Sequence, residues 1–269
     1  WQAKVRDISG SEDRLTYGLP AECGVLLLDV PAGGGAAKAG LKKDDVIIAC
    51  NTVEAKTVAD IRAMADQAAG QKLALAVIRK QKQMTVEMSD YVYVVRENLW
   101  TTEFKKIPVT AALAVVPAKV STGGADLNKD ALDLLVDGKV ALNRGPTFAN
   151  GVDTGKYKLD LAEVKSIARI NTYASGNTRA RQSFVLYGSS AASDPGWNVA
   201  DATVFTPVIT VDSRSGERTE YEATSIRRSA GKPLGSFRWL VWAASPTLGE
   251  IGGQNTTFEE LQVIPAAAK

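Results

Sequence analysis

The pattern of apolar residues changes near residue 91, and this change most limits what the chain can fold into. Before it, strand-like apolar runs alternate with runs at helical spacing. After it, short alternating runs typical of strands are separated by Gly, Asn, Asp and Ser. A chain of 269 residues has room for two domains. We therefore expect a multidomain chain, with an α+β domain over 1–90, a linker over 91–106 and an all-β sandwich over 107–269.

The first 90 residues predict a small mixed domain. The expected elements are a strand, a short helix, a strand, a longer helix and a hairpin, over Gly24–Val30, Ala36–Leu41, Asp45–Asn51, Thr57–Ala69 and Leu73–Met88. Thr57 is the expected N-cap of the longer helix, and Gly70 is its expected stop. The polar stretch 80–83 predicts the turn of the hairpin.

The runs 24–30, 36–49 and 58–62, in this order and spacing, resemble a bacterial PDZ domain of the type found in periplasmic proteases. The resemblance implies that an extended peptide binds by adding a strand beside an edge strand, expected here at Trp1–Val5. Trp1, Gln2 and Ala3 are therefore candidate peptide contacts. The family's carboxylate-binding loop would lie at or before Trp1, so the sequence is expected to begin inside that loop and to bind peptides weakly.

The resemblance also assigns faces to the longer helix. It implies that Val58, Arg62 and Ala65 line the peptide groove. The positions expected to face the core are Ile61, Met64 and Ala68. A shift of one residue in register reverses this assignment. The alternative is that Val58 and Ala65 are partly buried helix residues with no ligand.

The later runs alternate apolar and polar residues, as half-buried antiparallel strands do. The clearest are Gly155–Leu161, Ile167–Tyr173, Gln182–Ser189, Phe237–Trp242 and Phe258–Val263. Together with Leu135–Gly138 and Trp197–Ala200, they resemble in order the galactose-binding-like jelly rolls, which include discoidin modules and many carbohydrate-binding modules. The sequence departs from that pattern by a longer polar insertion at 192–228 and by an altered Asp-Gly motif. The resemblance implies a module that binds glycans or other surface ligands.

This second resemblance implies a structural calcium held by Asp137, in an Asp-Gly turn, and Glu260, at the head of the last strand. The alternative is a turn aspartate and an exposed strand glutamate, and an enzymatic acid–base pair is less favoured than either. A sugar site needs an aromatic ring beside polar loop residues. The candidates are Phe148, Asn150, Asp153, Asn177, Arg179 and Arg181. The two arginines equally fit an exposed turn and strand face.

Tryptophans and cysteines give further expectations. Trp197 is expected to pack at the start of a strand. Trp239 and Trp242 are three residues apart in one strand, so they point to opposite faces, and at least one belongs to the core. Cys23 and Cys50 flank neighbouring antiparallel strands and are expected to lie close together, either bonded or as two free thiols.

The absence of histidine excludes much chemistry. Neither a Ser-His-Asp arrangement nor the usual zinc sites can be built, and no cofactor other than calcium is expected. With 32 basic and 30 acidic residues, the chain lacks the charge expected of a nucleic-acid-binding protein. No apolar run reaches the roughly 18 residues needed for a membrane span.

These observations predict a non-catalytic binding region of a larger exported bacterial protein, periplasmic or extracellular. The PDZ-like part would bind a peptide or a neighbouring domain of the parent protein, and the jelly roll would bind a glycan. The alternative is that both parts are accessory domains packed against the catalytic domain of a hydrolase, which lies outside this sequence.

Overall fold

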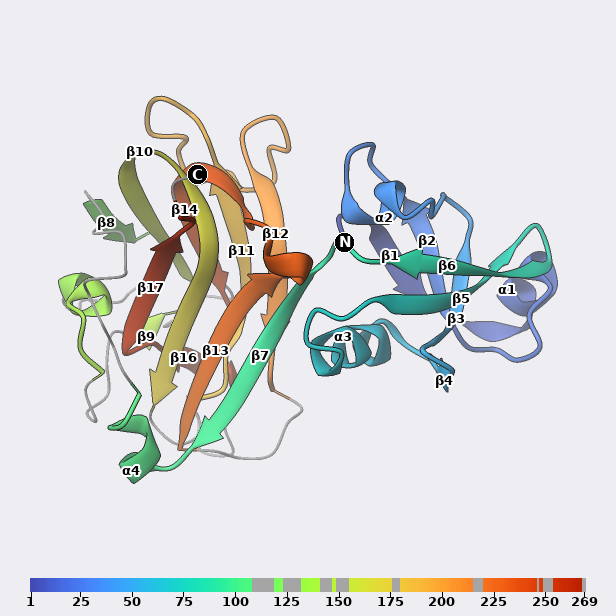
Figure 1. Cartoon of the computed structure of the whole chain (residues 1–269), viewed down its shortest axis with the longest axis horizontal. Helices are drawn as coiled ribbons and strands as arrows, with labels where there is room; N and C mark the ends of the chain where they lie inside the picture. The colour runs from blue at the N-terminus through green and yellow to red at the C-terminus, as the bar shows by residue number, and fades with distance from the viewer. Residues whose placement is uncertain are drawn as a thin grey trace. The chain divides into compact units, whose positions relative to one another are not determined.

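A computed structural model describes residues 1–107, 119–122, 132–140, 147–148, 155–175, 180–214, 220–245, 247–248 and 254–267 (Figure 1). The chain divides into two compact units. Unit 1 comprises residues 1–95 and 228–232, and unit 2 comprises residues 96–227 and 233–269. The expected combination of an α+β domain and an all-β sandwich is confirmed.

Unit 1 is an antiparallel sheet with helices. Its elements in chain order are β1 Lys4–Asp7, α1 Gly10–Tyr17, β2 Val25–Asp29, α2 Gly35–Lys38, β3 Val46–Cys50, β4 Val53–Glu54, α3 Val58–Gln67, β5 Leu73–Arg79 and β6 Lys82–Met88. The strand order is β1-β2-β3-β5-β6, with β4 paired to β3. The strand β1 therefore lies at one edge of the sheet.

The helix α3 begins where the sequence predicted. The Thr57 side chain accepts a hydrogen bond from the Asp60 amide, and the Asp60 carboxylate accepts one from the Thr57 amide. This capping box satisfies two amides at the helix start. Ile61 and Ala65, one turn apart, are buried against the sheet.

The predicted hairpin is confirmed, but its turn is tighter than the polar stretch 80–83 suggested. Arg79 pairs with Lys82, so only Lys80 and Gln81 form the turn. Both have positive φ, 51° and 62°, as a type I′ turn requires. The second strand therefore begins at Lys82 rather than at Met84.

Residues 91–106, expected to be a linker, instead hold the strand β7 Val92–Leu99 and the short helix α4 Thr101–Phe104. Tyr91 and Tyr93 are buried in the core of unit 1. The Tyr91 hydroxyl donates to the Gln71 carbonyl over 2.5 Å, and burial raises its pKa to about 12. A side chain at Gly70 would meet the Tyr93 ring at 2.7 Å. The domain therefore extends beyond residue 90.

Unit 2 is built from strands. Its further elements are β8 Lys119–Thr122, the 3-10 helix η2 Leu132–Val136, β9 Thr147–Phe148, β10 Gly155–Ser175, β11 Ser183–Ser189, β12 Thr206–Asp212, β13 Tyr221–Arg228, β14 Gly235–Ala244, β15 Thr247–Leu248, β16 Gln254–Thr257 and β17 Glu260–Pro265. One sheet has the order β12-β11-β14-β10-β13-β7, with β17 and β8 also paired to β10, and a second has the order β15-β16-β9.

The strand β10 joins two strands that were predicted separately. Its first half pairs with β14 and β8, and its second half pairs with β13 and β17. The pairing with β14 is interrupted between Asp160 and Lys165, where Ala162 has a φ of 67°. This bulge lets one strand continue through a break in the apolar alternation. None of the helices in the described ranges is both long and apolar enough to cross a membrane.

We predict that a fragment of residues 1–95 melts at a clearly higher temperature than a fragment of residues 1–90. The shorter fragment loses the buried side chains of Tyr91, Tyr93 and Val94, and removing one buried aromatic ring typically costs about 3–5 kcal/mol. Circular dichroism during heating measures the difference. Both fragments lack residues 228–232, so the comparison is matched, and equal melting temperatures would place the boundary at residue 90 after all.

Candidate functional site

The edge strand β1 and the helix α3 form the candidate peptide site of unit 1. Among the described strands, β1 pairs with β2 alone. The Val58 amide, at the first turn of α3, donates to Asp7 Oδ1 over 2.7 Å, which ties the helix to the end of the strand. On the far side of β1, both Arg6 and the Ser9 amide bind Asp13, and they hold the pKa of that carboxyl at about 2.

Alternate residues of β1 direct their backbone groups outward. The Ile8 amide donates to the Gly24 carbonyl of the neighbouring segment. Arg6, two residues before Ile8, lies opposite Leu26, so its backbone groups face β2 in the same way. In an antiparallel ladder the intervening residues point their N–H and C=O groups away from the partner. Val5 and Asp7 therefore offer these groups at the open edge, which is what an added peptide strand requires.

The residues assigned to the groove are distributed differently from the expectation. Trp1, Gln2 and Ala3 precede the strand, which begins at Lys4, because Gln2 has a φ of 59° that breaks the extended conformation. Trp1 and Ala3 still pack against the core, as do Val5 and Val58.

On α3 the assigned positions also separate. Arg62 is exposed and Val58 is half-buried, as a groove wall requires. Ala65, expected beside them, is instead buried in the core with Ile61. Met64 and Ala68 pack against the same core, as predicted.

The strands that Cys23 and Cys50 flank are antiparallel neighbours, as predicted: Val25 of β2 pairs with Ile47 of β3. Both thiols are free. Cys50 is buried in the core, and Cys23 Sγ lies 3.5 Å from Glu54 Oε1. Burial raises the pKa of both thiols, so neither is a reactive thiolate.

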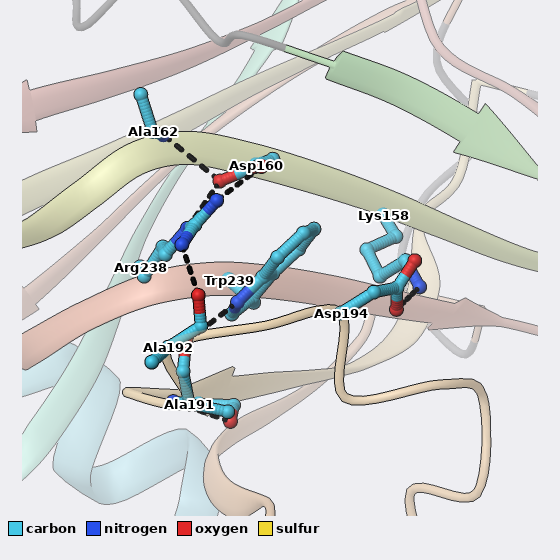
Figure 2. Close-up of polar contacts among 9 residues, drawn as sticks. Lys158, Asp160, Ala162, Ala191, Ala192, Asp194, Arg238 and Trp239 are labelled. Atoms are coloured by element: carbon cyan, nitrogen blue, oxygen red, sulfur yellow. Dashed lines mark hydrogen bonds and ion pairs between the residues drawn. The ribbon is translucent and has the colours of Figure 1, made fainter.

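In unit 2, ion pairs anchor the segment that follows β11 (Figure 2). Lys158 on β10 is buried and forms an ion pair with Asp194. Asp160, two residues along, accepts two hydrogen bonds from Arg238 over 2.9 and 3.0 Å. Arg238 also donates to the Ala192 carbonyl. These charged groups bind one another, so they fasten the segment to β10 and β14.

The anchored segment after β11 accounts for the burial of the tryptophans. Both Trp239 and Trp242 are buried, although they point to opposite faces of β14. The indole N–H of Trp239 donates to the Ala191 carbonyl over 2.9 Å, so the anchored segment covers the face that sequence reasoning left open. Trp197 is half-buried, and its ring lies 4.2 Å from the Lys158 ammonium, a cation–π contact.

The structure brings Asp137 and Glu260 together. Glu260 is only 2% exposed, contrary to the alternative of an exposed strand glutamate. Burial and the nearby Asp137 carboxylate raise the pKa of Glu260 to about 8. Its Oε2 has no hydrogen-bond partner among the described residues. A divalent cation would neutralise both carboxylates and satisfy this oxygen, so the two residues fit the expected calcium. Within the described ranges, however, no group of three or more acidic, cysteine or histidine residues surrounds a common point.

Most of the expected sugar-binding residues cannot be placed. Asn150, Asp153, Asn177 and Arg179 lie outside the described residues, and only the backbone of Phe148 is described, in β9. Arg181 is half-buried before β11 and donates to the Arg214 carbonyl.

Sequence reasoning missed a buried polar network inside unit 2. The Gln182 side chain bonds Thr172 and Thr224, and its backbone amide donates to Ser213 Oγ over 2.9 Å. Ser213 Oγ in turn donates to Glu222 Oε1 over 2.8 Å. Burial raises the pKa of Glu222 to about 7 despite this bond. Polar residues at alternating inward positions of β13, Glu222 and Thr224, were the only signal in the sequence.

Residues 4–89 match the family model described as the PDZ domain. Unit 1 is a PDZ domain. Among solved structures, the PDZ domain of HtrA3 bound to a phage-derived ligand is 18% identical, covers 32% of this chain and 80% of its own, and superposes with a TM-score of 0.28.

The remainder of the chain is similar to family 32 carbohydrate-binding modules. The paired modules of Clostridium perfringens ZmpB in complex with GalNAc are 15% identical and cover 66% of this chain and 42% of their own, with a TM-score of 0.42. The module of Streptococcus pneumoniae EndoD is 11% identical and covers 57% of this chain and 99% of its own, with a TM-score of 0.41. No curated protein matches the chain.

We predict that the free energy of unfolding of unit 2 falls as the pH rises from about 4.5 to about 7. The folded state keeps a proton on Glu222 in this window, whereas the unfolded state releases it, so unfolding becomes more favourable as protons become scarce. The slope from one such group is roughly 1 kcal/mol per pH unit. Urea unfolding of Glu222→Gln should show a smaller slope than the wild type. The exposed neighbour Glu220 provides the control, because Glu220→Gln should leave the slope unchanged.

Proposed function

We propose that this chain is a non-catalytic binding region in which the PDZ domain takes an extended peptide. The observation that carries the proposal is the open edge of β1, where the outward backbone groups of Val5 and Asp7 lie beside the start of α3. Partly buried Val5 and Val58 offer apolar surface for alternate peptide side chains. Exposed Arg62 places a positive charge on the same helix.

We expect Val5→Pro to weaken peptide binding by about fivefold, because proline removes an outward N–H, and a hydrogen bond contributes about 1 kcal/mol. Proline is tolerated on an edge strand when its nitrogen faces away from the ladder. The best binder from a library of free C-terminal peptides is titrated against both proteins by calorimetry.

The control is Val5→Ala, which shortens the same side chain but keeps the N–H. Equal affinities of the alanine and proline variants would contradict strand addition. A library without any binder would favour the rival function, in which the domain packs against a neighbouring part of the parent protein.

We further propose that unit 2 binds carbohydrate at its loop end, with Phe148, Asn150, Asp153, Arg179 and Arg181 as the contacting residues. The half-buried position of Arg181 just before β11 supports this assignment. The parent protein would be exported and bacterial, and the chain periplasmic or extracellular. A hydrolase domain outside this sequence is the expected parent activity.

We also propose that Asp137 and Glu260 hold a structural calcium. The buried, unpartnered Glu260 Oε2 and the adjacent Asp137 carboxylate support the proposal. A bound calcium would supply positive charge where two carboxylates otherwise repel each other.

Removing calcium with a chelator should lower the melting temperature of unit 2, because a ligand of the native state stabilises by mass action. Glu260→Gln relieves the carboxylate repulsion, so this variant should melt at a temperature that is insensitive to chelator. Asp13→Asn, in the PDZ domain, controls for loss of an unrelated carboxylate. A wild-type melting temperature unaffected by chelator would contradict the calcium proposal. A glycan array without hits would contradict the carbohydrate proposal.

A further inference from the structure

One face of the strands β17, β10 and β13 carries side chains that, apart from Glu260, none of the sites above uses. At one end of this face Tyr173, Gln262 and Glu260 are buried, whereas its half-buried members are Arg169, Asn171, Ser225 and Arg227. Ile170 and Thr172 of β10 are fully buried and point to the interior. Because successive side chains of a strand alternate between faces, Arg169, Asn171 and Tyr173 lie on the opposite face. In Figure 1, β17, β10, β13 and β7 lie side by side in this part of the sheet.

The strand register brings two arginines together on this face. Ile170 pairs with Ile226, and Asn171 pairs with Ser225. Continued by one residue beyond Ile170, this register would place Arg169 opposite Arg227. Residues opposite each other in such a pair have Cβ atoms about 4.5–5.5 Å apart, and like charges there are destabilising. The two guanidinium groups therefore share one region of the surface.

Neither guanidinium is neutralised by a carboxylate of the described residues. Arg169 Nε is buried without a hydrogen-bond partner. Arg227 Nε donates only to Ser225 Oγ, over 3.0 Å. By contrast, five other arginines in the described ranges each form an ion pair with an aspartate: Arg6, Arg79, Arg214, Arg228 and Arg238. At the other end of this face, burial raises the pKa of Tyr173, and the charges of Glu260 and Glu97 add to this shift.

Neutral hydrogen-bonding groups surround the arginine pair. Asn171 Nδ2 donates to Gln262 Oε1 over 3.1 Å, and the Ser225 hydroxyl lies on the same face. The backbone groups of β10 and β13 are used in ladders on both sides, so a peptide could not add a strand here. A ligand must be recognised by side chains alone.

We propose that this face binds an acidic saccharide, with its carboxylate between Arg169 and Arg227 and its hydroxyls near Asn171 and Ser225. Guanidinium groups take carboxylates in a two-pronged geometry. The Asn171 amide and the Ser225 hydroxyl suit the hydroxyls of a sugar ring. This site is separate from the proposed loop-end site and does not rest on it.

The test titrates the full chain with oligogalacturonate by calorimetry, using neutral galacto-oligosaccharide of the same length as the comparison. We expect the neutral sugar to bind at least tenfold more weakly, and the affinity for oligogalacturonate to fall as salt is added. Arg169→Gln and Arg227→Gln should each weaken binding by tenfold or more. Lys165→Gln, the same change of charge on the same strand, should alter the affinity less than twofold.

A second measurement separates binding from folding. Without ligand, Arg169→Gln should melt at the same temperature as the wild type or higher, because one of two facing like charges is removed. If Arg169→Gln does not fold, Arg169→Lys keeps the charge but loses the fork, and it should also weaken binding.

Four outcomes would overturn the inference. Equal affinity for neutral and acidic sugars would show that the arginines do not recognise the carboxylate. Binding of the acidic sugar that survives both arginine substitutions would show the same. A tetraglutamate peptide that binds as tightly as oligogalacturonate would assign the face to acidic proteins. Failure of both oligogalacturonate and oligoglucuronate to bind would leave the face without the proposed ligand.

Discussion

The backbone pairing of β10 holds the described part of unit 2 together. This strand hydrogen-bonds to β14 and β8 along its first half and to β13 and β17 along its second. The bulge around Ala162 interrupts the pairing with β14, which resumes at Lys165–Ile167 before β13 takes over at Ile170. Because its backbone groups are committed to these ladders, β10 can contribute to recognition only through side chains. Lys158 and Arg169 accordingly act through their side chains.

Buried charges act differently in the two halves of β10. In the first half, Lys158 and Asp160 each have a partner of opposite charge, and these pairs fix the segment after β11. A buried pair is costly to break, since removal of one partner leaves the other uncompensated. In the second half, Arg169 lacks such a partner among the described residues, and so does Arg227 of the neighbouring strand β13. The paired charges fasten a segment of the fold, whereas the unpaired ones belong to the proposed ligand surface.

The sequence predicted the elements whose signals are local. The capping residue Thr57 and the hairpin around Lys80 depend on a few neighbouring residues, and both predictions are confirmed. The break at 162–165 looked like a loop because a bulge interrupts apolar alternation as a turn does. Tyr91 and Tyr93 looked like a linker because their core lies far earlier in the sequence. The register that would place Arg169 opposite Arg227 depends on the pairing of strands distant in sequence, which no local pattern reveals.

The charged residues of β1 have a consequence for self-association. Three of its four residues, Lys4, Arg6 and Asp7, are charged, and the strand is short. An open sheet edge can template the addition of identical chains one after another, and brief, charged edges resist this. A parallel, in-register addition of a second copy would place Lys4, Arg6 and Asp7 each opposite its own like charge, whereas a single incoming peptide can differ in sequence from β1. The same edge can therefore accept a foreign strand while discouraging the growth of aggregates.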